Sequence, residues 1–156
     1  MKILLLGIGQ ALRGDDSAGL EAVQLWQTLH HESAAQVQVE FSELAGLELL
    51  GLLDGRKAAI IVDAVQSHGS SGEVIRLGPE ELAGFTPGAG SGHGFGVAET
   101  LQLGKSLYPS LAECRITLIG ITGAQFDIGA GLNPKVRLAI KNAVDVIDTE
   151  IQSYLK

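Results

Sequence analysis

The sequence contains a single cysteine and has fewer basic than acidic residues. Because Cys114 is the only cysteine, the chain cannot form an internal disulfide or a thiolate zinc cage. Cys114 precedes an apolar strand-like run, and we expect it to be a small buried residue. With 11 Lys and Arg against 18 Asp and Glu, the formal net charge is −7. This charge argues against nucleic acid as a partner, since such binding relies on neutralising phosphates.

Long apolar runs are also missing. No stretch reaches the roughly 18 consecutive apolar residues that a membrane span requires. The apolar run after Met1 and Lys2 is too short for a signal peptide with its cleavage site. We therefore expect a soluble, cytoplasmic protein that is a monomer and has no membrane as a partner.

The chain does contain a regular alternation of strand-like and helix-like segments over 156 residues, of which 46% are hydrophobic. This length and composition suit one compact domain that covers residues 1–156. Apolar or alternating runs predict strands at 2–7, 37–41, 58–62, 73–77 and 115–122. Helical patterns lie at 16–31, 46–53, from 79, over 97–109 and over 134–155. We predict an α/β fold, a three-layer αβα sandwich with a mostly parallel twisted sheet.

The same periodicity predicts which residues are buried. Strands that are apolar on both faces belong in the centre of a parallel sheet, which should bury Leu4, Ile60, Val62, Leu118 and Ile119. The first helix should bury a stripe made of Ala18, Ala22, Leu25, Trp26 and Leu29. The helix over 97–109 should turn Val97, Leu101 and Leu107 inward.

A glycine turn follows the first strand. Gly7 and Gly9 end the strand, and Asp15 and Asp16 stand where the first helix begins. The two acids would repel a phosphate at the helix N-terminus, and the dinucleotide fingerprint fails because Leu12 occupies its third glycine position. A turn that presents carboxylates suits a cation, so we predict the start of a metal-related site here.

Three side chains are the candidates for chemistry: Asp16, Asp63 and His93. Asp63 ends the strand over 58–62, and His93 lies in a segment with six glycines, residues 84–96. Ligands bind beyond the carboxyl ends of parallel strands, so the three could meet. Two carboxylates and an imidazole can ligate a divalent transition metal and leave positions open for a substrate. Taken singly, each has a plainer interpretation, as a first-turn acid, a surface acid and a loop histidine.

Other polar residues are assigned more simply. We assign Asp15 a structural role at the start of the helix, and the same holds for His30, His31 and His68. A nucleophile-elbow hydrolase is a poor fit, because no strand precedes Ser91 in its Gly-Ser-Gly context. A proton-sharing pair of Asp16 and Asp63, as in aspartic proteases, stays open.

Five motifs occur in order along nearly the whole chain: Gly7-x-Gly9-x-x-Leu12-x-x-Asp15-Asp16-x-x-Gly19, Gly46-Leu47-Glu48-Leu49-Leu50, Val62-Asp63-Ala64, the His93 loop running into Gly96-Val97-Ala98, and Gly120-Ile121 followed by Gly131-Leu132-Asn133-Pro134. Together they resemble the NiFe-hydrogenase maturation endopeptidases. The chain departs from that pattern at Gln10, where the family usually has Asn, and at Gly123-Ala124, which replaces a frequent Pro-Glu.

The resemblance implies a function. It implies an endopeptidase that removes a short C-terminal extension from a hydrogenase large-subunit precursor after nickel insertion. The family's metal-binding and catalytic positions carry over to Asp16, Asp63 and His93. The nickel belongs to the substrate and is sensed by the protease, so the resemblance implies no tightly held cofactor. Whether the metal polarises the scissile carbonyl or a carboxylate activates water stays open.

Two other functions compete with this one. A non-enzymatic nickel-sensing maturation chaperone could use the same three ligands. A nucleotide-binding protein is disfavoured by the acidic turn. Incubation with nickel-loaded precursor, followed by a search for the mass of a released peptide, separates the protease from the chaperone.

The glycine-rich segment 84–96 generates a prediction. Fixing it needs roughly 1–2 kcal/mol of backbone entropy for each residue. We predict that it becomes ordered when the metal of the precursor meets His93, since an imidazole suits nickel better than two carboxylates alone. Hydrogen exchange should show protection with metal-loaded precursor, and none with metal-free precursor or in His93→Ala. Equal protection by both precursors would identify a plain surface connection.

Overall fold

A computed structural model of the chain describes residues 3–43, 48–67, 70–83, 93–94 and 96–156. In this part of the chain six strands form one sheet in the order β2-β1-β3-β6-β4, with β5 paired to β3. The strands are β1 (Leu4–Ile8), β2 (Gln38–Ser42), β3 (Ala58–Ser67), β4 (Val74–Leu77), β5 (His93–Gly94) and β6 (Arg115–Gly123). The first three neighbour pairs in that order are parallel, whereas β4 and β5 run antiparallel to their neighbours.

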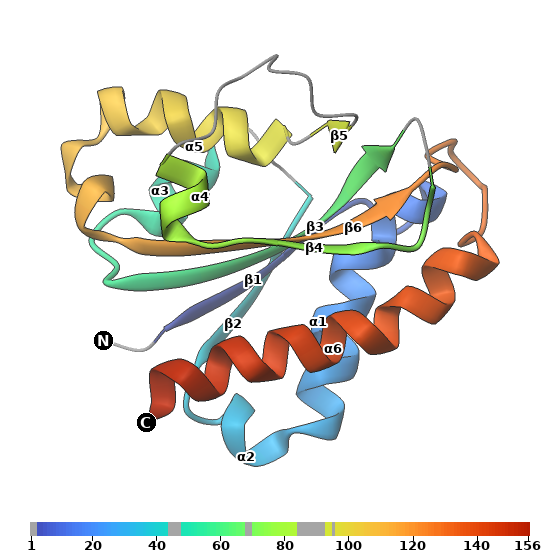
Figure 1. The fold of residues 1–156 in the computed structure, drawn as a ribbon, viewed down its shortest axis with the longest axis horizontal. Helices are drawn as coiled ribbons and strands as arrows, with labels where there is room; N and C mark the ends of the chain where they lie inside the picture. The colour runs from blue at the N-terminus through green and yellow to red at the C-terminus, as the bar shows by residue number, and fades with distance from the viewer. Residues whose placement is uncertain (1–2, 44–47, 68–69, 84–92, 95) are drawn as a thin grey trace.

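Helices cover both faces of the sheet (Figure 1). The helical elements are η1 (Gly14–Ser17), α1 (Ala18–Leu29), α2 (His31–Ala34), α3 (Glu48–Leu53), α4 (Pro79–Ala83), α5 (Gly96–Leu107), η2 (Pro109–Glu113) and α6 (Pro134–Leu155). One face carries α1 and α6, and the other carries α3, α4 and α5. This arrangement confirms the predicted αβα sandwich with its mostly parallel sheet.

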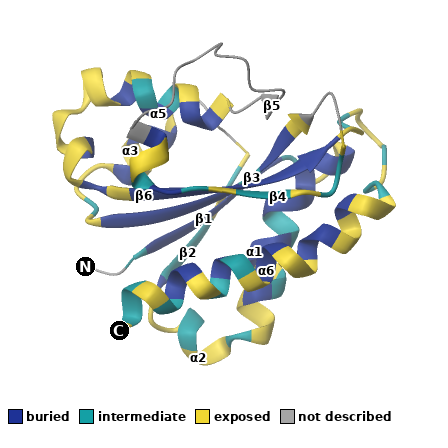
Figure 2. Cartoon of the chain, viewed as in Figure 1, coloured by how far each residue is buried: buried dark blue, intermediate teal, exposed yellow. Residues whose placement is uncertain are grey.

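The core lies on both sides of the sheet, because successive residues of a strand point to opposite faces. Leu4 and Leu6 of β1 pack with Leu49 and Leu101 on one side, while Leu5 packs with Trp26 on the other. The residues predicted to be central, Leu4, Ile60, Val62, Leu118 and Ile119, are all buried, as the dark strands of Figure 2 illustrate. Full burial of each such side chain contributes about 1.5–3 kcal/mol.

Two helical predictions are wrong in detail. The expected helix over 16–31 is a 3-10 turn, then α1, then a break at His30 before α2, so Leu29 falls at a helix end and is 61% exposed. Leu107, expected to point inward, is 55% exposed. Gly104 takes the buried position on α5, where an added Cβ would lie 2.4 Å from a methyl group of Leu50.

The strand predicted over 58–62 continues to Ser67, and Asp63 therefore lies within β3 instead of at its end. The extension has a partner, because β6 stays in register with β3 as far as Gln66 opposite Gly123. On the other side β1 pairs with β3 only as far as Val62 opposite Gly7. Asp63 is thus the first residue of β3 beyond its pairing with β1.

The order of the strands creates a crevice at this edge. The chain passes from β1 through α1 outward to β2, then returns through α3 to β3 on the other side of β1. The direction of winding reverses between β1 and β3, and ligands bind at such switch points in open α/β sheets. The loop after β1 and the C-terminal half of β3 meet at this crevice.

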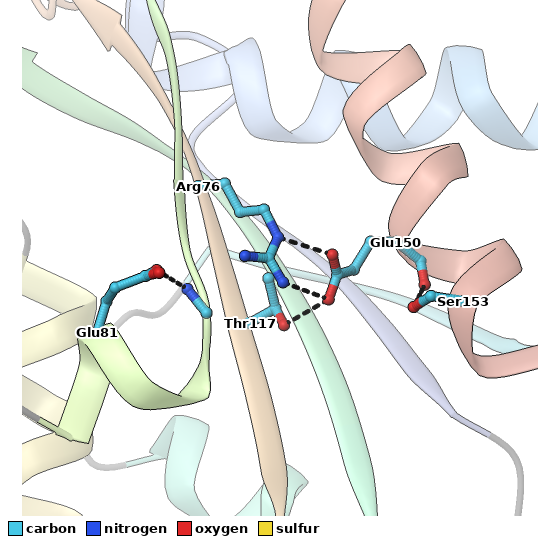
Figure 3. A network of polar contacts seen from close by, with 6 residues as sticks. Arg76, Glu81, Thr117, Glu150 and Ser153 are labelled. Atoms are coloured by element: carbon cyan, nitrogen blue, oxygen red, sulfur yellow. Dashed lines mark hydrogen bonds and ion pairs between the residues drawn. The ribbon is translucent and has the colours of Figure 1, made fainter.

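A buried carboxylate on α6 joins this helix to two strands (Figure 3). Glu150 accepts hydrogen bonds from the guanidinium of Arg76 on β4 at 2.8 and 3.1 Å, and from the hydroxyl of Thr117 on β6 at 2.8 Å. Burial raises the pKa of Glu150, but the hydrogen bonds from Arg76 and Thr117 and the positive charges of Arg76 and Arg115 more than offset this effect, so the pKa is lowered. The carboxylate fastens the edge strand β4 and the last helix to β6.

Replacing Glu150 should therefore destabilise the protein. In Glu150→Gln the free energy of unfolding should fall by about 1–3 kcal/mol, the typical value of hydrogen bonds to a charged buried group. A lowered carboxyl pKa contributes stability above the unfolded value of 4.5, and this stability is lost as the pH falls through the folded pKa. Below pH 4.5, the free energy of unfolding of the variant should consequently depend less on pH than that of the parent chain.

Urea unfolding between pH 3 and 7 measures both effects. Asp145→Asn, on an exposed position of the same helix, is the matched control and should change stability by less than about 0.5 kcal/mol. A Glu150→Gln variant with the stability and pH slope of the parent chain would contradict the interpretation of the network.

Candidate functional site

Two glycines place Asp16 over the sheet edge. A Cβ on Gly9 would lie 2.0 Å from the main-chain oxygen of Asp16, and a Cβ on Gly19 would lie 2.5 Å from the oxygen of Val62. Only glycine permits these approaches, so the end of β1 contacts η1 directly and the start of α1 packs against the main chain of β3. The Asp16 carboxylate, which is half-buried, accepts the N–H of Gln10 at 3.0 Å.

Asp63 lies next to this turn, and its pKa is raised from the ordinary value of 3.8 to about 7. The largest cause is burial, which disfavours the charged form, and the second is the negative charge of Asp16. The N–H of Ala64, which donates to the Asp63 carboxylate at 2.8 Å, acts in the opposite direction. The two carboxylates predicted from the sequence are therefore close enough to repel each other.

A cleft of about 210 Å³ opens beside Asp16. It is lined by Arg13, Asp16, Ala64, Gln66 and Phe126. The Nε–H of Arg13 donates to the main-chain oxygen of Phe126 at 3.2 Å, which links the loop after β1 to the loop after β6. The cleft lies at the carboxyl edge of the sheet, where the winding reverses.

His93 is placed by its backbone only. It belongs to β5, opposite Ser67 near the end of the strand that carries Asp63. Its side chain lies outside the described residues, as do residues 84–92 and 95 of the glycine-rich segment, and His68. Among the side chains that the structure describes, no group of three His, Cys, Asp or Glu could hold a metal ion. The three-ligand site therefore stays a prediction, for which Asp16 and Asp63 supply the described pair.

Asp15 is structural, but it does not cap the helix. Its buried carboxylate accepts three main-chain N–H groups of the loop after β6, from Ala124 and Gln125 at 2.8 Å each and from Asn133 at 2.7 Å. Its own N–H donates to the oxygen of Gln125. A Cβ on Gly123 would lie 2.7 Å from the Cβ of Asp15, so glycine is needed there. We call this cross-loop arrangement the Asp15 clasp.

Other hollows and polar groups fit a site less well. An apolar hollow of about 210 Å³ lies near the opposite end of β6 and includes Leu82, Leu101 and Cys114 in its lining, but no carboxylate. Burial raises the pKa of the Cys114 thiol to about 11, which keeps it neutral at ordinary pH. His30 is engaged elsewhere, with its Nδ1 3.4 Å from a carboxylate oxygen of Asp148.

The sequence reasoning missed Arg13, Gln66 and Phe126 as cleft residues. Arg13 carried a usable signal, because it is a basic residue in the turn that leads to the two acids. Gln66 was hidden by the unpredicted extension of β3. Phe126 enters the cleft only through the contact between two loops far apart in the sequence.

Several known proteins resemble this chain in sequence and in fold. A family described as hydrogenase maturation protease matches residues 23–150. The chain is 28% identical over 148 residues to the hydrogenase 2 maturation protease of Escherichia coli, covering 94% of this chain and 88% of the relative. The structure of the hydrogenase maturating endopeptidase HybD from E. coli superposes with a TM-score of 0.76 at 25% identity, covering 99% of this chain and 94% of that one.

A second solved structure shares the fold. The NiFe-hydrogenase maturation protease HybD from Thermococcus kodakarensis gives a TM-score of 0.71 at 24% identity, with 97% and 99% of the two chains covered. None of the helices in the described ranges is long and apolar enough to cross a membrane.

The two causes of the raised pKa of Asp63 can be separated. In Asp16→Asn the repulsion disappears while burial remains, so the pKa of Asp63 should fall from about 7 yet stay above 3.8. A carboxyl-carbon NMR titration of the metal-free protein measures this value. The exposed Asp145→Asn is the control and should leave it unchanged. An unaltered Asp63 pKa in Asp16→Asn would mean that the two carboxylates do not share one site.

The same shift predicts a pH dependence of stability. Since the folded pKa of Asp63 lies above the unfolded one, ionisation of Asp63 opposes folding, and stability should fall as the pH rises from about 4 to 7. Asp63→Asn removes this charge, so its stability relative to the parent chain should be greater at pH 8 than at pH 4. Urea unfolding at both pH values provides the check.

Proposed function

Because the chain belongs to the hydrogenase maturation protease family, we propose that it is an endopeptidase that removes the C-terminal extension of a NiFe-hydrogenase large-subunit precursor after nickel insertion. Its substrate is a protein whose cleavable tail lies beside a bound metal ion. The proposal adds to family membership the idea that Asp16, Asp63 and His93 sense that metal.

One observation carries this proposal: two carboxylates that repel each other face a common edge next to a cleft. Without a metal, burial and the negative charge of Asp16 both disfavour the ionised form of Asp63, and they raise its pKa to about 7. A divalent cation presented by the precursor would relieve the repulsion and displace that proton. Two carboxylates with an imidazole form a donor set that suits a divalent transition metal such as nickel.

The two carboxylates lie beside the cleft, and this position is suited to a substrate tail that enters the cleft from solvent. Asp16 lines the cleft and Asp63 immediately precedes Ala64, which also lines it. The backbone of His93 runs along β3 beside the same cleft residue Gln66, since Gly94 pairs with Gln66. A tail laid in the cleft would therefore pass both carboxylates, which would hold the precursor's cation against the bond to be cut.

Binding in the cleft would fix the orientation of the tail. Such positioning of reacting groups contributes strongly to catalysis. The cation can polarise a nearby carbonyl oxygen of the tail. The chain's own part is to bind the cation through Asp16 and Asp63 and to fix the tail in the cleft with Arg13 and Gln66.

Processing of a nickel-loaded precursor tests the proposal. The parent chain should release a peptide whose mass matches the C-terminal extension, and nickel-free precursor should stay intact. Asp16→Ala and Asp63→Ala should each lower the processing rate by about a hundredfold or more, because even outer partners of metal ligands are typically worth 10–100-fold. Asp145→Ala, an exposed acid on α6, should process at the parent rate.

The outcomes distinguish the competing functions. A loaded precursor that binds the chain but keeps its full mass would identify a nickel-sensing chaperone in place of a protease. Unchanged processing by Asp16→Ala or Asp63→Ala would remove that residue from the site.

A further inference from the structure

Two loops at the sheet edge each expose a large aliphatic side chain. Leu12, in the loop after β1, is 76% exposed, and Ile128, in the loop after β6, is 80% exposed. These are the two highest exposures among the large apolar residues in the described part of the chain. The N–H of Gly129 donates to the main-chain oxygen of Leu12 at 2.8 Å, which brings the backbone next to Ile128 against that of Leu12. We call this pair the Leu12–Ile128 platform.

The platform residues are close in sequence to residues that line the cleft. Arg13 follows Leu12 directly, and Phe126 precedes Ile128 by two residues, and both line the cleft that contains Asp16. The hydrogen bond from the Nε–H of Arg13 to the main-chain oxygen of Phe126 links the two loops next to the platform residues. An extended peptide in the cleft would therefore reach the platform within a few residues of the two carboxylates.

The platform is also held in place before any ligand binds. The Asp15 clasp ties the loop after β6 to η1 through three N–H groups on one carboxylate. The bonds of Leu12 and Arg13 to the same loop add two further links. Since the loops are already fixed, a ligand that packs on them need not supply the free energy to order them.

Aliphatic side chains that fixed loops hold beside a cleft can pack against an apolar side chain of a peptide that enters the cleft, because this removes apolar surface from water. Leu12 and Ile128 belong to neither buried core of the protein. The neighbouring guanidinium of Arg13 has N–H groups in addition to Nε–H, and these can donate to carbonyl or carboxylate oxygens of a peptide. The chain has a net charge of −7. The positive charge of Arg13 beside the cleft therefore favours binding of a peptide segment that is rich in hydrogen-bond acceptors.

We propose that the Leu12–Ile128 platform binds an aliphatic side chain of the precursor segment that adjoins the cleaved bond, while Arg13 donates to oxygens of that segment. The platform is thus a specificity-determining surface for the substrate tail, and this inference rests on the proposed protease function. It assigns the substrate a chemical requirement: an apolar residue close to the bond that is cut.

Steady-state processing of nickel-loaded precursor tests the inference. Leu12→Ser and Ile128→Ser should each raise the KM by about tenfold and change the kcat by less than about twofold, since the lost contact serves substrate binding. Leu29→Ser is the matched control, because Leu29 is 61% exposed at the far end of α1. Its KM should stay within about twofold of the parent value.

The substrate side supplies a second measurement. The product mass locates the cleaved bond, and each aliphatic residue of the precursor next to that bond is then replaced by Ser. The substitution that raises the KM for the parent chain should have little further effect on Leu12→Ser or Ile128→Ser. Thermal unfolding of both variants should match that of the parent chain, because the replaced side chains are exposed.

The results separate the two proposals. A parent chain that does not cleave loaded precursor overturns the proposed function and the inference with it. Cleavage by the parent chain with an unchanged KM in both platform variants overturns the inference alone, as does a fall in the kcat without a rise in the KM. Conversion of a dimeric parent chain to monomer by Leu12→Ser would show that the platform binds a second copy, which also overturns it.

Discussion

A steric constraint at Gly19 sets the geometry on which the rest of the site depends. The absence of a side chain lets the start of α1 contact the main-chain oxygens of Val62 and Ile8, at distances where a Cβ would clash. This contact holds η1 next to the point where the pairing of β3 with β1 ends. Asp16 in η1 and Asp63 on β3 are close for this reason, although 47 positions separate them in the sequence. Hydrophobic clusters on both faces of the sheet support the elements that make this contact.

The closeness of Asp16 and Asp63 creates electrostatic repulsion between their carboxylates. Most polar groups of the fold are matched, and Glu150 illustrates this, since Arg76 and Thr117 satisfy its carboxylate and lower its pKa. Asp63 is the opposite case, because burial and Asp16 both raise its pKa and only the N–H of Ala64 opposes them. Perturbed ionisable groups concentrate at functional sites. The contrast between the two carboxyls separates the part of the molecule that maintains the fold from the part that we propose binds a ligand.

The layers of the fold could be predicted from the sequence, because β1, β3 and β6 are apolar on both faces and only a covered parallel sheet accommodates such strands. Asp16 and Asp63 could be predicted as neighbours, since each follows an apolar run whose carboxyl end lies at the same edge of the sheet. The extension of β3 could not, because it depends on the length of its partner β6. Leu29 and Leu107 were misplaced since helix ends depend on packing that periodicity does not contain. The ring of His93 lies outside the described residues, so the third ligand rests on the sequence alone.

The Asp15 clasp has a consequence for how this protein can be altered. Since one carboxylate holds the main chain of a second loop, residues 12–16 and 123–133 form a single mechanical unit despite their separation in the sequence. Gly14 and Gly123 belong to this unit, because a Cβ on either would clash across the junction. Grafting one loop from a relative would leave a buried charge facing mismatched donors, a fault worth several kcal/mol. Exchange of substrate preference between relatives should therefore require both loops to be transplanted together.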